Sequence, residues 1–508
     1  MAKKEIIFTV VIMVVMVTVG LLIQLYYMQN SQIIDPGPVS RIYLARGWLE
    51  APVFPISLDK SPLYLHVMAG IISLVRLIGG SGSGAGLIQA EILGLRLFSL
   101  GFSLLLLAPY FKLVKLVFNE RIAVYSTFFL VVYPTYIRMS TVPYEMAVFL
   151  FFIFTFLFLI FRFKATGRRY DLLVASLALF VSSMLRPESW IMIPIFAAAM
   201  IAWKRYKLLP LFLGIGLAYP VLLMAASYYY SRDPLHYLSR NDQSALITSS
   251  YIGASVFNRI MAWPTYFHRN LPWFSGWLIL AGLGYSIVKK RCLALGLIAG
   301  IFLSVYICKT LRLTLNVREH YSLLIGLLLL PYAGLVIDKL VSLNRKAVLV
   351  LTILFLLLTG AFSVKQAMQV YPEGEHSQMP AAEKELTQWI AANIKEDNFV
   401  LIATDNLDIF GVILYSGADF SRRQVITTWQ LRIKDELGLE RLGFLLKNKK
   451  LTHVIIADEW GDQEKLNAFI GLALNDSRNK FFKYELLPWA ALKGYSVYKT
   501  NYSLDQAK

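Results

Sequence analysis

Residues 138–160 read RMSTVPYEMAVFLFFIFTFLFLI, in which every residue from Met146 onward is apolar except Thr155. The apolar part is long enough to begin a membrane span. Glu145 stands directly before it. A carboxylate at such a position either marks the boundary with water or belongs to a functional site. The choice depends on the side of the membrane that the carboxylate faces.

Similar apolar runs recur along the chain. The protein has 508 residues, of which 57% are hydrophobic, and its mean hydropathy is +0.57. Repeated apolar runs of about 20 residues predict an α-helical polytopic membrane protein. The net charge of +18 resides in short basic clusters between these runs. That pattern orients membrane proteins, and it differs from the continuous basic surface of a nucleic-acid-binding protein.

The hydropathy predicts eleven spans, and the basic clusters predict their orientation. Five clusters lie in alternate connections and a sixth, Lys3 and Lys4, lies near the N-terminus. If all six are cytoplasmic, the C-terminus lies outside a cell membrane. The predicted spans are 5–28, 92–111, 122–138, 143–161, 170–186, 188–203, 208–229, 272–288, 292–309, 319–338 and 346–366.

Residues 62–79 (PLYLHVMAGIISLVRLIG) are hydrophobic enough to be read as a twelfth span. That reading would move five basic clusters to the outside. We therefore predict that this segment, which contains His66 and Arg76, is a helix at the outer interface. It would belong to a first external loop of residues 29–90, and residues 230–271 would form a further external loop.

The composition changes at about residue 370, so 1–370 are predicted to form the membrane domain. In the remainder, 371–508, the helical patterns AAEKELTQWIAANI, ELGLERLGFLLKNK and EKLNAFIGLAL alternate with the strand patterns NFVLIAT, THVIIAD and YSVYKT. This alternation predicts a small extracytoplasmic α/β domain. Because it contains no nucleotide-binding or metal-ligand motif, we expect it to have an accessory or acceptor-contacting role.

Charged residues gather at the predicted outer face. Asp35 follows the first span, and Glu145 precedes the fourth. Each carboxylate alone is more typical of a membrane boundary than of a catalyst. Cations at the same face are suited to hold a phosphate, although each is equally suited to lipid headgroups. These cations are Lys60, Arg138, Arg186, Arg312 and Arg318.

Several of these charged residues stand in short motifs. The motifs, in order, are Asp35, Ala45-Arg46, Lys60-Ser-Pro-Leu-Tyr64, Leu95-Arg96-Leu97-Phe98-Ser99, Tyr144-Glu145, Arg186-Pro187-Glu188, Arg318-x-x-Tyr321 and Pro331. Taken together, they resemble those of GT-C glycosyltransferases, in particular the dolichyl-phosphate-mannose protein mannosyltransferase and aminoarabinose transferase group. The resemblance covers about residues 1–370. The chain departs from the family at Pro36, often Glu, at Ser61, often Pro, and at Glu145, often Asp.

The resemblance implies an enzyme that moves a sugar from a polyprenyl-phosphate carrier to an extracytoplasmic lipid, glycan or protein acceptor. A departing phosphate monoester has a second pKa of about 6, so it needs cations rather than a general acid. The attacking hydroxyl needs a carboxylate to accept its proton, and in-line displacement inverts C1. We predict Asp35 as that base and Glu145 as a group that positions hydroxyls. The predicted substrate-binding residues are Lys60, Arg138, Arg186, Glu188, Arg312, Arg318 and Tyr321.

Several alternatives stay open. No cofactor is expected, but Asp35, Glu145, Glu188 and Glu319 could together hold a divalent cation through hard oxygen ligands. A related enzyme of the oligosaccharyltransferase or polymerase kind would use a pyrophosphate carrier, which favours the metal. A transporter or flippase for lipid-linked glycans is the alternative from another class, although no two halves of the chain resemble each other. A non-catalytic membrane scaffold is the third.

Overall fold

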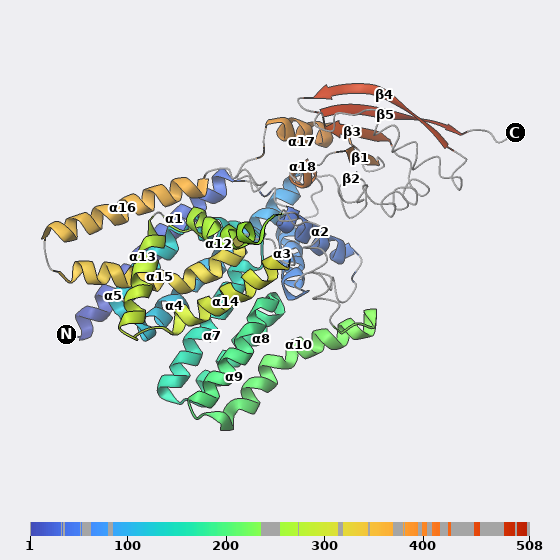
Figure 1. Cartoon of the computed structure of the whole chain (residues 1–508). Coiled ribbons are helices and arrows are strands. Elements are labelled where there is room, and N and C mark those ends of the chain that lie inside the picture. The colour runs from blue at the N-terminus through green and yellow to red at the C-terminus, as the bar shows by residue number, and fades with distance from the viewer. Residues whose placement is uncertain are drawn as a thin grey trace. The chain divides into compact units, whose positions relative to one another are not determined.

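A computed structural model of the chain is mostly helical, with one small sheet near the C-terminus (Figure 1). Contacts divide it into two compact units. We call Met1–Gln29, Phe54–Val67 and Leu95–Gln369 the helical unit, and Asn30–Val53, Met68–Gly94 and Val370–Lys508 the mixed unit. The structure describes residues 2–31, 33, 36–50, 52, 62–79, 85–234, 254–272, 274–312, 319–343, 346–368, 379, 381–394, 399–403, 409–416, 425–427, 452–457, 482–492 and 495–504.

The helical unit contains most of the apolar helices, and α3 and α4 continue from it into the mixed unit. Among these helices, α7, α8 and α10 pack side by side (Figure 1). The helices are α1 (Ala2–Asn30), α3 (Pro62–Gly79), α4 (Ala85–Val117), α5 (Glu120–Val131), α6 (Pro134–Thr141), α7 (Met146–Thr166), α8 (Arg169–Leu185), η1 (Pro187–Ile191), α9 (Met192–Ala202), η2 (Tyr206–Leu208), α10 (Leu209–Ser231), α12 (Val256–Asn270), α13 (Ser275–Val288), α14 (Ala294–Leu311), α15 (Glu319–Val341) and α16 (Lys346–Met368).

The predicted class, a polytopic helical membrane protein, is confirmed. Within the described residues, eight helices are long and apolar enough to cross a membrane. Seven of them coincide with predicted spans, and the eighth is the segment that we placed at the interface, 62–79. The other predicted spans correspond to the bent pair α5 and α6, to α8, and to the shorter apolar helices Pro187–Ala202 and Ser275–Val288. The number of spans and the interfacial position of 62–79 therefore stay predictions.

A proline separates α5 from α6. Pro134 is the first residue of α6, and the two helices meet at an angle of 63°. Proline has no backbone N–H and its ring clashes with the preceding turn, so it is favoured at the first position of a helix and promotes a break or a kink elsewhere. The result is a separate short helix, Pro134–Thr141, that leads directly to Glu145.

Glycine allows two apolar helices of the helical unit to approach closely. A Cβ added to Gly282 of α13 would lie 2.1 Å from the carbonyl oxygen of Tyr332 in α15. A side chain of any size is therefore excluded there. Small residues have this role in membrane helix pairs, where close backbone approach replaces the hydrophobic effect as a source of packing energy.

The mixed unit contains a five-stranded sheet with the order β2-β1-β3-β5-β4. Strands β1 and β3 are parallel, with Leu401 opposite Val454, whereas β5 pairs with β3 in the antiparallel direction. The fully buried β3 has the apolar composition expected of a parallel strand that is covered on both faces. The elements are α2 (Pro36–Glu50), α17 (Ala381–Asn393), α18 (Ile409–Ser416), β1 (Val400–Ala403), β2 (Val425–Thr427), β3 (His453–Ala457), β4 (Phe482–Leu492) and β5 (Tyr495–Leu504).

This sheet confirms the predicted small α/β region. The predicted helix AAEKELTQWIAANI corresponds to α17, and the three predicted strands correspond to β1, β3 and β5. The two other predicted helices, 436–449 and 464–474, lie outside the described residues. Parts of the predicted first external loop also belong to the mixed unit, since the backbone N–H of Ile33 donates to Tyr415 at 2.9 Å. The predicted division of the chain at 370 stays a prediction.

A buried carboxylate connects three helices of the mixed unit. Glu91, in the first part of α4, is fully buried and pairs with Arg46 of α2 at 3.2 Å and with Arg76 of α3 at 2.7 Å. Two cations on one carboxylate compensate its burial, whereas an unpaired buried charge would be strongly destabilising. The arrangement fixes α2 and α3 against the start of α4.

Candidate functional site

Glu145 occupies the N-cap position of α7 without capping it. Its backbone is helical (φ −59°, ψ −10°), and its side chain makes no capping hydrogen bond. The backbone carbonyl of Glu145 accepts from the N–H of Phe149 at 2.8 Å, which is the first helical hydrogen bond. The carboxylate is therefore free of the usual capping role, yet its residue is only 4% exposed. Its partner comes from another helix.

That partner, Arg186, follows the last residue of α8. Pro187 stands next to it, and the helical region is disfavoured for a residue before proline. Arg186 accordingly has extended backbone angles (φ −150°, ψ 132°), and the short helix η1 begins at Pro187. The Arg-Pro-Glu sequence thus ends one helix and turns the side chains of Arg186 and Glu188 toward each other.

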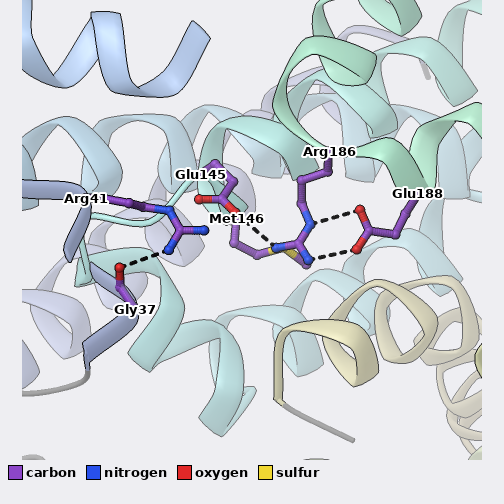
Figure 2. A network of polar contacts seen from close by, with 6 residues as sticks. All are labelled: Gly37, Arg41, Glu145, Met146, Arg186 and Glu188. Carbon is purple, nitrogen blue, oxygen red and sulfur yellow. Dashed lines mark hydrogen bonds and ion pairs between the residues drawn. The ribbon is translucent and has the colours of Figure 1, made fainter. Parts of the chain in front are cut away.

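The guanidinium of Arg186 lies between two carboxylates (Figure 2). Its Nε and Nη2 donate to Oε2 and Oε1 of Glu188 at 3.2 and 2.8 Å. Its Nη1 donates to Oε1 of Glu145 at 3.4 Å and contacts the sulfur of Met146 at 3.9 Å. These three groups carry a formal charge of −1, and Lys309 also attracts Glu188 electrostatically. We call Glu145, Arg186 and Glu188 the acidic site. Separately, within the mixed unit, Arg41 donates to the carbonyl of Gly37 at 2.9 Å (Figure 2).

Aromatic rings enclose the same guanidinium. The ring centroids of Tyr144, Phe149 and Tyr321 lie 5.9, 6.0 and 5.5 Å from its central carbon. Arg186 is consequently buried, and the low-dielectric surroundings strengthen its attraction to the carboxylates. The rings also fix the plane of the guanidinium, which sets the direction of its donors.

A stack of aromatic side chains continues from Tyr321 to α12. The rings of Tyr321 and Tyr306 are 5.2 Å apart, and Tyr306 lies parallel to Trp263, 10° between planes and 5.6 Å between centroids. The indole N–H of Trp263 donates to Thr310 at 3.2 Å. Trp263 and Tyr306 are both almost fully buried. The position of Tyr321 against Arg186 thus depends on packing that begins in the predicted external loop 230–271.

Two further buried arginines lie at α6, one within this helix and one that reaches it from α4. Arg138 donates through Nη2 to Oδ1 of Asn270 at 3.1 Å, and Thr135 donates to the same oxygen at 3.1 Å. Arg96 of α4 donates through Nε to the carbonyl of Thr141 at 3.0 Å. A cation at the C-terminal end of a helix is favourable, because the last carbonyl groups there carry partial negative charge.

The structure brings some of the predicted site residues together. Glu145, Arg186, Glu188 and Tyr321 form one cluster. Arg138 bonds to Asn270 on another helix, and Arg312 is the exposed C-cap of α14. Asp35, Lys60 and Arg318 lie outside the described residues, as does the side chain of Glu319.

Sequence reasoning missed three residues. Arg96 is an ionisable residue in a predicted span, which is a signal in itself, but the motif that contains it assigns it no role. Trp263 and Asn270 carry no comparable signal, since their importance comes from contacts with distant helices.

Within the described parts of the chain, no group of three or more His, Cys, Asp or Glu residues is placed to hold a metal ion. Of the four predicted ligands, Glu145 and Glu188 bond to Arg186. The described geometry suits hydrogen bonding to hydroxyl groups, because two oriented carboxylates offer acceptor oxygens in a buried site.

Two solved membrane proteins share the fold. ArnT from Cupriavidus metallidurans, bound to undecaprenyl phosphate, matches with a TM-score of 0.60 and 12% identity, over 96% of this chain and 97% of its own. AglB, an oligosaccharyltransferase from Archaeoglobus fulgidus in complex with an inhibitory peptide and a dolichol-phosphate, matches with a TM-score of 0.56 and 13% identity, over 98% of this chain and 74% of its own. No family model and no curated protein sequence matches the chain. The chain therefore has the GT-C fold, as the motifs predicted.

Proposed function

We propose that this protein is a membrane glycosyltransferase that moves a sugar from a polyprenyl-phosphate carrier to an extracytoplasmic lipid, glycan or protein acceptor. One observation carries the proposal: the buried Glu145–Arg186–Glu188 cluster lies at helix ends of a GT-C fold. Two solved examples of that fold contain undecaprenyl phosphate and dolichol-phosphate. The two oriented carboxylates offer hydrogen-bonding oxygens at fixed, buried positions. Hydroxyl groups of the sugar and of the acceptor molecule can donate to them.

Arg186 has a different role here from the one predicted for it. Its three nitrogens already face two carboxylates, so it is a poor candidate to bind the carrier phosphate. We assign it to positioning: it holds Glu145 and Glu188 in place and compensates their burial. Glu145 and Glu188 then accept hydrogen bonds from hydroxyl groups of the sugar or the acceptor.

Proton transfer and phosphate binding are assigned to other residues. Asp35 accepts the proton of the attacking hydroxyl while that oxygen bonds to C1 of the sugar and the bond from C1 to the phosphate oxygen breaks. The departing phosphate keeps the bonding electron pair, and Lys60 and Arg318 stabilise its charge. Arg138 and Arg312 are further phosphate-binding candidates. Displacement from the opposite face inverts C1.

The proposed orientation has the site and the C-terminal domain outside the cytoplasm. It is supported by the six basic clusters, which all fall on one side in the eleven-span arrangement. A reporter fused after Lys508 tests it. Activity of a reporter that functions only outside the cytoplasm is expected, and activity of one that functions only inside would overturn the orientation.

The activity is tested with purified protein and a radiolabelled polyprenyl-phosphate sugar. Asp35→Asn keeps the size of the side chain but cannot accept the proton, so turnover should fall by about 10²–10⁴-fold. Lys60→Ala should weaken carrier binding as well as turnover, because a phosphate ligand acts in both the ground state and the transition state. Asp35→Asn with more than about a tenth of the parent turnover would contradict the base role. Mass spectrometry of the envelope lipids and glycans of a deletion strain identifies the acceptor.

A pyrophosphate carrier is the second candidate, since AglB is an oligosaccharyltransferase and one AglB structure is a complex with Zn and sulfate. Here Asp35 and Glu319 would join Glu145 or Glu188 as oxygen ligands of a divalent cation. The two candidates differ in donor and in metal. Transfer from a monophosphate carrier that persists in EDTA supports the first, whereas transfer only from a pyrophosphate carrier with added cation supports the second.

A further inference from the structure

Helix α12, Val256–Asn270, directs four large apolar side chains away from the protein. Val256, Phe257, Ile260 and Met261 are 62%, 68%, 38% and 42% exposed. Their spacing of one, three and four residues places them on one face of a helix. Within the described parts of the chain this face is uncovered, although it contains four large hydrophobic side chains.

The opposite face of α12 directs polar groups toward the protein. Arg259 donates through Nη1 to the carbonyl of Leu311 at 3.0 Å, which satisfies a carbonyl at the end of α14. Asn270 is 1% exposed and accepts hydrogen bonds from Thr135 and Arg138. Trp263 lies on the same side and donates to Thr310.

This polarity is the reverse of that of a helix on a water-soluble surface. In water, exposed side chains such as Phe257 are unfavourable and an arginine turned toward the protein must be compensated, so such a helix would turn the other way. In lipid, apolar groups are stable outside, and polar groups must find partners within the protein. Helix α12 follows the second pattern.

The location of α12 agrees with its polarity. It packs against α14 and α15, and its contacts with α14 involve Thr310 and Leu311, the last residues of a candidate span. Leu297 and Ile301 of that span are also exposed apolar residues. Helix α12 thus packs against a helix that also exposes apolar side chains suited to contact with lipid.

We propose that the face formed by Val256, Phe257, Ile260 and Met261 is immersed in the membrane interface, and that its partner is the lipid of the leaflet on the side of the Glu145–Arg186 cluster. The predicted external loop 230–271 then contains a lipid-bound helix rather than a wholly aqueous connection. Amphipathic helices of this kind lie in the plane of the interface with the apolar face among the acyl chains.

Spin labels at single cysteines test this immersion in lipid nanodiscs. The chain has two cysteines, so Cys292→Ser and Cys308→Ser give a background without thiols. Labels at Phe257→Cys and Met261→Cys report the apolar face, and Asn258→Cys reports the neighbouring polar edge of the same helix. Leu297→Cys in α14 is the lipid reference, and Lys384→Cys on the exposed side of α17 is the aqueous reference.

Collisions of each label with oxygen, which dissolves in lipid, and with a water-soluble nickel chelate are compared. We expect oxygen-to-nickel ratios at 257 and 261 that approach the ratio at 297 and exceed those at 258 and 384 by several-fold. Ratios near the aqueous reference would overturn the proposal, and low collision rates with both reagents would show a protein partner instead. The side chains of Phe257 and Met261 are exposed, so their replacement by labelled cysteines removes no buried packing.

Discussion

Arg186 and Glu188 are two residues apart in the chain and are joined by two hydrogen bonds, Nε to Oε2 at 3.2 Å and Nη2 to Oε1 at 2.8 Å. The remaining terminal nitrogen is directed at Glu145. Only a planar guanidinium can direct donors at both carboxylates in this way, because an ammonium group is a single compact charge.

We therefore expect Arg186→Lys to lower turnover by about 10²-fold although the charge is kept, since small displacements of positioning groups have effects of that size. Radiolabelled sugar transfer by the purified variant measures it. Arg162→Lys is the matched control, because Arg162 pairs with Asp171 near the opposite end of α7. Equal losses in the two variants would show that the Arg186 effect is merely structural.

Glu145→Gln should lower turnover less than Asp35→Asn and leave carrier binding unchanged. Glutamine still accepts a hydrogen bond from Arg186 but offers a weaker acceptor to a hydroxyl group, so the loss is one of positioning. Titration of the acceptor separates kcat from KM, and Glu120→Gln in α5, which loses an exposed pair with Lys115, is the control. A variant with parent kinetics would make Glu145 a boundary residue.

Gly282→Ala should destabilise the helical unit, whereas Gly284→Ala should not. The added methyl group at 282 meets the carbonyl oxygen of Tyr332 at 2.1 Å, while nothing lies within 4 Å of a Cβ at 284. Both residues are in α13, where alanine has the higher helix propensity, so propensity alone predicts stabilisation at both positions. Thermal unfolding in detergent measures the difference. Equal melting temperatures for the two variants would mean that α13 and α15 accommodate the methyl group at 282 without loss of stability.

Much of this arrangement could be predicted from the sequence. The apolar run after Glu145 predicts α7, and the basic clusters, placed on one side of the membrane, predict that Glu145 and Arg186 share a membrane face. Hydropathy could not assign residues 62–79, because an interfacial helix and a short span have the same composition.

Other features depend on distant contacts. The spacing of Val256, Phe257 and Ile260 shows that α12 has an apolar face, but not whether that face points to the protein or to lipid. The hydrogen bond from Arg96 ends on a backbone carbonyl, which leaves no mark in the sequence. The second carboxylate partner of Arg186, Glu145, becomes evident only when the ends of α7 and α8 meet.

The sheet of the mixed unit should lose stability as the pH falls from about 6.5 to about 4. His453 is 3% exposed in β3, and burial, with Lys499 opposite it on β5, lowers its pKa from 6.5 to about 4. Between these two pH values the unfolded chain binds a proton at His453 that the folded chain does not. The free energy of unfolding is therefore highest above about pH 6.5 and decreases as the pH falls toward about 4.

Thermal unfolding of the full chain between pH 7.5 and 4.5 measures this effect. His453→Gln keeps a polar side chain of similar length without a titrating group, so its melting temperature should fall less over this range than that of the parent. Identical pH dependence of parent and variant would exclude His453 as the source.

Trp263→Leu should impair transfer although Trp263 does not touch Arg186. The indole stacks on Tyr306, Tyr306 packs on Tyr321, and the Tyr321 ring lies against the guanidinium. Loss of the indole leaves space beside Tyr306, so the side chains of Tyr321 and Arg186 become more mobile. The carboxylates that Arg186 holds are then no longer fixed in one orientation. Trp263→Phe keeps an aromatic face but loses the hydrogen bond to Thr310 and part of the buried ring volume, so its turnover should lie between those of the parent and Trp263→Leu.

A double-mutant cycle distinguishes this coupling from general destabilisation. If Trp263 acts through Arg186, then Trp263→Leu should have little further effect on turnover in an Arg186→Lys background, because the positioning is already lost. Trp277→Leu is the control, since Trp277 is 65% exposed on α13 and its replacement should leave turnover unchanged. Fully additive losses of Trp263→Leu and Arg186→Lys would show that the aromatic stack stabilises the helices without controlling the acidic site.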